Sequence, residues 1–206
     1  MNHSRKHKFI TSLLILFSLS TAHQGLAQDP ALEDFTLRSR SITANFTAAL
    51  IRTCELEVES LGLHAATEVC RITAPQVYYE HSIKNHIILN LVSLNPRNPV
   101  TGHADAWEQA GLLKMQQLLD QGHNPDTIEI AALVKEPAET YYRYMKPMIA
   151  TPFCLKCHGT EQHLSRDLVN TIKHFYPDDH SFGYRLGELM GAVSIKKIYT
   201  PPVNNR

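Results

Sequence analysis

The sequence predicts an α+β domain with a largely antiparallel sheet. Helical periodicity fills the chain up to about residue 85, and four β-rich segments with two further helices follow. The 206 residues, 43% of them hydrophobic, suit one domain with one core and are too polar for several membrane spans. Because no repeat or low-complexity linker divides the chain, we expect one domain over residues 28–200 and a frayed tail over 201–206.

Residues 1–27 have the three-part layout of a secretory signal peptide. The basic segment MNHSRKHK precedes an apolar stretch from Phe9 to Leu19 and a small-residue segment. Gly25 and Ala27 suit the −3 and −1 positions of a cleavage site, so we expect removal after Ala27. A membrane anchor is the alternative, but the apolar stretch is shorter than the ~20 residues of a span. We therefore expect an exported periplasmic protein that is not integral to the membrane.

The first part of the mature chain is predicted to be helical. Residues 34–60 carry apolar side chains on one helical arc, and Gly62 is expected to break that helix. A short helix over 64–70 is predicted to stop before the sequence TAPQ. Thr73 has the features of an N-cap, with Pro75 in the first turn and Gln76 completing a capping box. A third helix is therefore predicted over residues 74–84.

The remaining segments alternate between strand and helix patterns. Strands are expected where β-rich runs meet turn signals, and helices where apolar residues recur at helical spacing. The expected strands cover residues 86–94, 127–134, 141–149 and 192–199, and the expected helices cover 104–122 and 165–177. Residues 95–102 and 178–191 are predicted loops. Trp107 is expected to be a core residue of the helix over 104–122.

Charge and composition exclude several functions. The chain has 20 basic and 20 acidic residues, and loss of the signal peptide would leave 17 against 20, so we expect no nucleic-acid partner. The sequence shows no arrangement of nucleophile, base and acid and no phosphate-binding glycine loop. It also shows no pair of carboxylates with a reason to lie close together. We therefore predict that the protein is not an enzyme. Asp178 and Asp179 are adjacent in a turn-like segment, where solvation is the usual explanation.

The segment TPFCLKCHGTEQHL contains the most specific motif, Cys154-x-x-Cys157-His158. Structural zinc needs four ligands, and the chain has no second knuckle of this kind. A thiol redox site wants a helix after the motif, which Gly159 opposes. The Cys-x-x-Cys-His pattern is the attachment signature of c-type haem, and export agrees with it. We predict one covalent haem c, with thioethers at Cys154 and Cys157 and His158 as the proximal iron ligand.

The second axial ligand decides how such a haem is used. Cys70 ends a small-residue helix, where Ala65 and Ala66 would let a flat macrocycle approach. Cys54 lies at the margin of the apolar arc of the first helix. Two alternatives follow from the local sequence: one of these thiols is an iron ligand, or Cys54 and Cys70 form a disulfide across a helical hairpin.

Haem propionates need cationic partners. Arg143 and Lys146, with Tyr142 and Tyr144 between or beside them, precede the motif on a predicted strand, and Arg97 lies in the Asn-Pro loop. Charge-assisted hydrogen bonds from such groups suit carboxylates. Arg143 and Lys146 are therefore candidate cofactor-binding residues, and ordinary exposed strand residues are the alternative interpretation.

Four segments resemble a bacterial family of exported c-type haem domains that was long described as a domain of unknown function. They are AATEVCRITAP, LNPRNPVTGHADAWE, YYRYMKPMIATPFCLKCHG and YPDDHSFGYRLGELMGAVSI, and the resemblance runs from about Asp34 to Lys197. It implies a PAS-like fold and an iron bound between His158 and a cysteine thiolate. Matching EVC before AP assigns that thiolate to Cys70, with Cys54 as the fallback. The segment LNPRNPVTGHADAWE departs from the family pattern, because it contains an extra Asn-Pro and a Gly-His.

The function that this combination predicts is a periplasmic monohaem sensor of redox state or of a small gas. A thiolate stabilises ferric iron, and reduction weakens its bond, so ligand exchange is built into such a site. A periplasmic redox or signalling protein is the expected partner. A small electron-transfer cytochrome is the first alternative, and a non-haem zinc or disulfide-stabilised binding module is the second.

Overall fold

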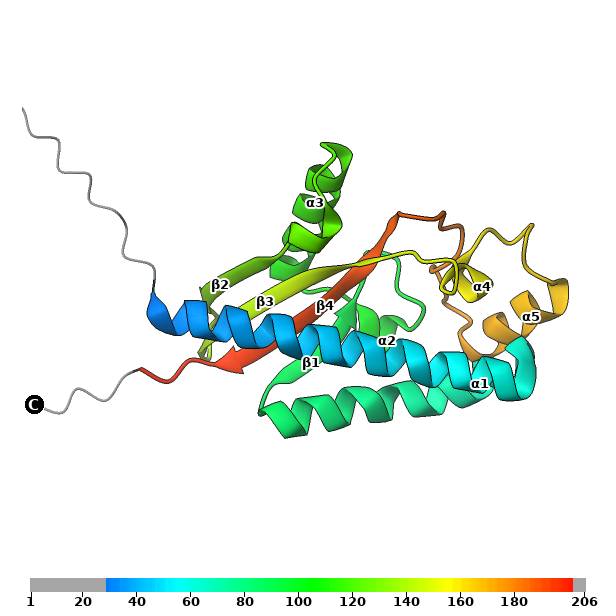
Figure 1. Ribbon diagram of the computed structural model, residues 1–206, viewed down its shortest axis with the longest axis horizontal. Helices are drawn as coiled ribbons and strands as arrows, with labels where there is room; N and C mark the ends of the chain where they lie inside the picture. The colour runs from blue at the N-terminus through cyan, green and yellow to red at the C-terminus, as the bar shows by residue number, and fades with distance from the viewer. Residues whose placement is uncertain (1–28, 202–206) are drawn as a thin grey trace, which may run out of the picture.

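The structure, a computed structural model, describes residues 29–201 (Figure 1). The predicted signal peptide and all of the predicted tail except Pro201 lie outside the described residues. The helices are α1 (Pro30–Asn85), α2 (Pro99–Gly102), α3 (Ala106–Asp120), α4 (Leu155–His158) and α5 (Arg166–Phe175), with a 3-10 turn at Pro125–Thr127. The strands are β1 (Ile88–Val92), β2 (Ile130–Lys135), β3 (Thr140–Ile149) and β4 (Leu189–Ile198).

The strands form one four-stranded sheet in the order β1-β4-β3-β2. All neighbouring strands are antiparallel, and Ile195 of β4 pairs with Leu89 on one side and Tyr144 on the other. The predicted α+β architecture with helices on an antiparallel sheet is therefore confirmed. In the described residues, no helix combines the length and apolar character that crossing a membrane requires.

Each face of the sheet is covered by different helices, because successive side chains of a strand point to opposite faces. On one face, Phe46 and Leu50 of α1 belong to a buried cluster with Tyr144 and Ile195. On the other face, Leu112 and Met115 of α3 pack with strand residues that include Met145 and Ala192. The antiparallel sheet thus has two apolar layers, and α1 defines the layer that leads to the cavity described below.

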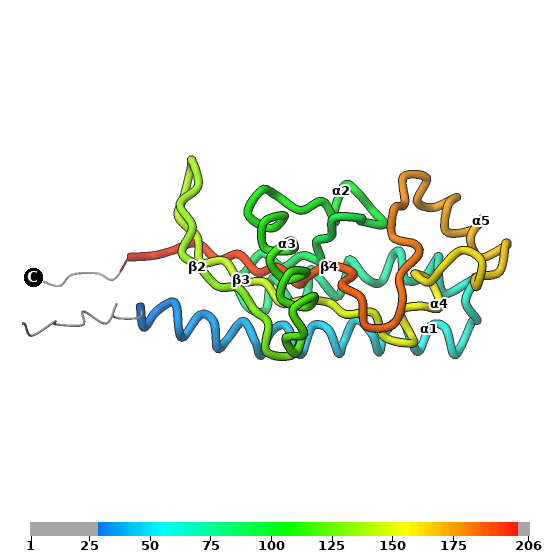
Figure 2. Tube along the Cα trace, turned by 90° about the horizontal axis from the view of Figure 1, so that it is seen from above, coloured from blue at the N-terminus to red at the C-terminus, as the bar shows by residue number. Residues whose placement is uncertain are grey.

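Helix α1 is a hairpin of two arms that meet at Gly62. Gly62 has φ 77° and ψ 166°, a backbone conformation that is essentially restricted to glycine. The arms then run back along each other (Figure 1), and the Phe46 ring lies 5.1 Å from the Tyr78 ring and 5.6 Å from that of His81. The predicted break at Gly62 is confirmed. Figures 1 and 2 both place α4 and α5 at the end of the molecule where α1 reverses.

The second arm of α1 corrects one prediction. Residues 63–85 form a single helix that continues through Pro75, so the separate helices over 64–70 and 74–84 do not exist. The Thr73 hydroxyl donates to the carbonyl of Val69 one turn earlier and does not cap a new helix. The local pattern at Thr73 and Pro75 resembles a helix boundary. Packing of this arm against the first arm and the sheet outweighs the hydrogen bond that Pro75 cannot make.

Smaller differences concern the ends of elements. Strand β4 begins at Leu189, inside the predicted loop, and Pro99–Gly102 form a short helix within the other predicted loop. The helix α3 starts with a capping box in which Asp105 accepts from the Glu108 amide and the Glu108 carboxylate accepts from the Asp105 amide. Neither difference changes the topology of the sheet.

Candidate haem site

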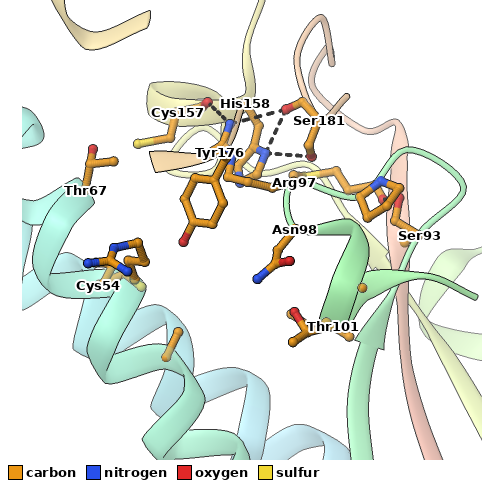
Figure 3. Close-up of a pocket in the computed structure, with 18 of the residues that line it drawn as sticks. Cys54, Thr67, Ser93, Arg97, Asn98, Thr101, Cys157, His158, Tyr176 and Ser181 are labelled. Carbon is orange, nitrogen blue, oxygen red and sulfur yellow. Dashed lines mark hydrogen bonds between the residues drawn. The ribbon is translucent and has the colours of Figure 1, made fainter. Parts of the chain in front are cut away.

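A cavity of about 730 Å³ lies between the two arms of α1, the end of β1 with α2, and the segments around α4 and Tyr176. This volume is in the usual range for sites that take a small molecule or cofactor. Figure 3 shows Cys157 and His158 on one side of the cavity, Cys54 on α1, and Asn98 and Thr101 on a third side. Apolar lining residues include Leu50, Ile51, Val58, Leu63, Leu91, Met148, Phe153 and Met190.

The motif Cys154-x-x-Cys157-His158 forms one helical turn, α4, which was not among the predicted helices. The amide of His158 donates to the carbonyl of Cys154 over 2.9 Å, and Thr151 holds the start of the turn through contacts to the amide and the sulfur of Cys154. Residues three and four apart share one face of a helix. This turn therefore presents both thiols and the imidazole to the cavity, which all three residues line.

His158 is held in one orientation by Ser181. Its Nδ1 lies 2.9 Å from both the carbonyl oxygen and the hydroxyl oxygen of Ser181. Burial, helped by the charge of Arg97, lowers the pKa of His158 to about 3, so its imidazole is neutral at physiological pH. An Nδ1–H that donates to a carbonyl leaves Nε2 as the free lone pair, which is the usual arrangement of a metal-binding histidine.

Arg97 connects the motif to the segment that contains Ser181 through hydrogen bonds. Its Nε donates to the Asp179 carboxylate over 2.8 Å, and its Nη2 donates to the carbonyl of Cys157 over 2.7 Å. Asp179 in turn accepts from the amide of Ser181 over 2.7 Å. The side chain of Asp179 is 0% exposed, so the prediction that solvation explains it is wrong. Arg97, Asp179 and Ser181 thus form a connected support for His158.

Cys54 and Cys70 come to the cavity from opposite arms of α1, and both are free thiols. A hydrogen bond between the two side chains and burial raise the pKa of Cys54. The same hydrogen bond lowers the pKa of Cys70, although burial opposes it. Cys54 also packs against the cluster that contains Phe46 and Leu50.

Arg143 and Lys146, predicted to contact the cofactor, do not line this cavity. Arg143 is buried on the α3 face of the sheet, where it forms ion pairs with Glu108, Asp105 and Glu136 and lies 4.5 Å from the centre of the Trp107 ring. Lys146 donates to the carbonyl oxygens of Asp126 and Ile128. The structure therefore does not bring either residue to the cavity, because the strand pattern did not tell which side chains share the face of the motif.

The aromatic and cationic neighbours predicted beside them are also engaged elsewhere. Tyr142 stacks on Phe35, and the Tyr144 hydroxyl donates to Glu129. Arg97 does line the cavity, but its strongest contacts are those that support the motif. Sequence reasoning overlooked Arg71, which lines the cavity and lies 5.0 Å over the Phe175 ring. Within residues 29–201 no hydrogen bond or ion pair involves its guanidinium.

The donor set fits haem c better than a structural zinc. Two thiols with the required spacing, an adjacent imidazole with one nitrogen engaged, and a third and fourth thiol across the cavity surround an apolar volume. Among the residues described, no group of three or more His, Cys, Asp or Glu side chains is placed to bind a metal ion by itself. Fold and site together define an α+β domain whose helical hairpin and Cys-x-x-Cys-His turn enclose one cavity.

The chain belongs to the Tll0287-like family, whose profile matches residues 20–197. Among solved structures, it is similar to the crystal structure of the cyanobacterial heme-protein Tll0287. The identity is 20%, the TM-score is 0.52, and the match covers 78% of this chain and 96% of that one. This likeness supports the fold. The comparison with curated proteins gave no significant match. The predicted family is thereby confirmed, and its PAS-like description stays a prediction.

Proposed function

We propose that this chain is an exported monohaem c protein that senses redox state or a small gas through an iron bound by His158 and Cys70. One observation carries the proposal: the Cys-x-x-Cys-His turn and the Cys70 arm of α1 line the same cavity, although they are far apart in the sequence. The structural relative described above is a heme-protein, and the chain shares the family of that protein.

Attachment is assigned to the two thiols of the α4 turn. Cys154 and Cys157 would form thioethers with the two vinyl groups of one haem. His158 would bind the iron through Nε2, because Ser181 occupies its Nδ1. The family resemblance assigns the other iron ligand to Cys70, and Cys54 is the fallback. The packing of Cys54 against the cluster of Phe46 and Leu50 supports this order.

A sensor is the better use of this ligand pair. Haem bound in this way supplies a one-electron couple whose ferric state an anionic thiolate stabilises. Cys70 lies on the second arm of α1, which the first arm meets at Gly62, so release of the sulfur would change the contacts of a whole helical arm. An electron carrier gains from a coordination shell that does not change. The signal would pass to a periplasmic redox or signalling partner.

The experiment is haemochrome analysis and absorption spectroscopy of protein produced with a cytochrome c maturation system. Covalent haem is expected in the wild type, in Cys70→Ala and in Cys54→Ala, and thiolate-type ferric absorption is expected in the wild type and in Cys54→Ala but not in Cys70→Ala. Cys54→Ala is the matched variant, and loss of that absorption in Cys54→Ala with retention in Cys70→Ala would reassign the ligand to Cys54. Absence of covalent haem would refute the proposed function. Fast electron exchange without a ligand change on reduction would favour the carrier.

A further inference from the structure

Two thiols of the cavity have no role in haem attachment. Cys54 and Cys70 both lie in α1, both line the cavity, and both are reduced. If Cys154 and Cys157 carry the haem, Cys54 and Cys70 are the two thiols left, since the chain has four cysteines. The inference below rests on the proposed function only where it concerns the iron. The pairing of the two thiols stands on the geometry of α1.

The hairpin of α1 brings these two residues together. Cys54 precedes Gly62 by the same number of residues as Cys70 follows it. In an antiparallel pair of helices, residues at equal distances from the bend lie at the same level. The side chains of Cys54 and Cys70 line the same cavity from the two arms of α1. Contacts between the arms, such as that of Phe46 with Tyr78, fix how the two arms are aligned along each other.

We propose that Cys54 and Cys70 form a reversible disulfide, and that this modification removes the Cys70 sulfur from the set of iron ligands. The reaction is thiol–disulfide exchange with a disulfide of a periplasmic thiol oxidase or of a small molecule such as oxidised glutathione. One of the two thiolates attacks the donor disulfide and releases one donor thiol. The other thiolate then attacks the mixed disulfide and releases the second. The donor gains two electrons and two protons, and the protein loses them.

Neither thiol is fully buried. Cys54 and Cys70 are half-buried, and each faces the cavity. A disulfide between them would close the loop around Gly62, so it would also stabilise the fold by restricting the unfolded chain. Its main consequence is chemical, because a disulfide sulfur is not the anionic ligand that a thiolate is. The pair would therefore couple the thiol redox state of the compartment to the cavity.

The test uses the mature holoprotein, with oxidised glutathione as the oxidant and a phosphine as the reductant. Maleimide labelling and peptide mass spectrometry should find both thiols free after reduction, and a Cys54–Cys70 crosslink with neither thiol labelled after oxidation. Thiolate-type ferric absorption should disappear on oxidation and return on reduction. Cys54→Ser is the control, because it keeps Cys70 and cannot form the crosslink, so its absorption should not respond to oxidised glutathione.

Three results would overturn the inference. The first is that both thiols stay labelled after oxidation, and the second is that oxidation joins either of them to Cys154 or Cys157. The third is that the crosslink forms but the ferric absorption is unchanged, which would contradict the effect on the ligand. A protein without covalent haem would fail the haemochrome assay, yet thiol labelling would still report the crosslink. Failure of the proposed function is therefore distinguishable from failure of this inference.

Discussion

The Nδ1 atom of His158 lies 2.9 Å from the carbonyl oxygen of Ser181, and Asp179 holds that carbonyl in place by accepting from the Ser181 amide. The orientation of the imidazole therefore depends on a carboxylate that does not touch it. Asp179 is in turn paired with Arg97, which also contacts the carbonyl of Cys157. Outer partners of this kind usually matter to a metal site nearly as much as its ligands.

Asp179→Asn should destabilise the protein. Breaking a buried ion pair leaves one charge unpaired, and Arg97 is only 17% exposed. We expect the free energy of unfolding, measured with urea, to fall by about 2 to 4 kcal/mol. Glu161→Gln is the matched control, because its ion pair with Lys173 is half exposed and should contribute less than about 1 kcal/mol. Equal losses in the two variants would contradict the assigned role of Asp179.

Gly62→Ala should strain the hairpin that brings Cys54 and Cys70 together. The φ of 77° and ψ of 166° at Gly62 suit glycine alone, although a new Cβ would meet no atom within 4 Å. The cost is therefore conformational, and we expect a loss of about 1 to 3 kcal/mol in the free energy of unfolding. Glu59→Ala, at a neighbouring exposed position, should change it by less than about 0.5 kcal/mol. An unchanged stability in Gly62→Ala would show that the bend tolerates another conformation.

Glu108→Gln should destabilise the protein without affecting the haem cavity, because the ion pairs of Arg143 lie on the other face of the sheet. Glu108 is 7% exposed and accepts from Arg143 and from the hydroxyl of Ser194. Loss of its charge should lower the free energy of unfolding by about 2 to 4 kcal/mol and leave the ferric absorption unchanged. Glu139→Gln, at an exposed position, is the control for stability. A shifted ferric spectrum in Glu108→Gln would mean that Arg143 acts on the haem after all.

Arg71→Gln should lower the midpoint potential of the haem. Arg71 lines the cavity and has no ion pair among the described residues, so it is a candidate cation for contact with a propionate. Losing a positive charge there favours the ferric state. The expected fall, measured by redox titration, is on the order of tens of millivolts, or about 1 kcal/mol. Arg52→Gln removes an exposed charge of the same helix that does not line the cavity, and an equal shift in both variants would contradict a specific contact.

Local patterns predicted the parts of the site that depend on local geometry. The Cys-x-x-Cys-His spacing indicated that Cys154, Cys157 and His158 act at one site, although their helical turn was not predicted, and Gly62 breaks α1 because its backbone requires glycine. The predicted helix boundary at Thr73 is wrong, because packing maintains one helix where the local pattern suggests a boundary.

Contacts between distant segments could not be predicted in the same way. Arg97 and Asp179 are 82 residues apart, so no local pattern indicates that they pair. The face on which Arg143 lies depends on the register of β3 with its neighbours, and a shift of one residue exchanges the two faces. The assignment of the iron ligand to Cys70 rests on the family resemblance, since the residues alone left its role open.

The contact between Arg40 and Glu129 should make the stability of the protein depend on pH. Arg40 of α1 donates to Glu129, just before β2, and this hydrogen bonding, which outweighs the effect of burial, lowers the pKa of Glu129 below its usual 4.5. A carboxylate with a lowered pKa in the folded state contributes stability above its unfolded pKa, and that contribution is lost as the pH falls through the folded value. Wild-type stability should therefore decrease as the pH falls below about 4.5.

In Arg40→Gln, the pKa of Glu129 should return toward its usual value, so less stability remains to be lost in acid. We expect a smaller difference between urea midpoints at roughly pH 6 and roughly pH 3.5 than in the wild type. Arg38→Gln is the control, because the ion pair of Arg38 with Asp34 lies within one helix and is largely exposed. If Arg40→Gln and the wild type lost equal stability in acid, the contact between α1 and the start of β2 would not be the source of the pH dependence.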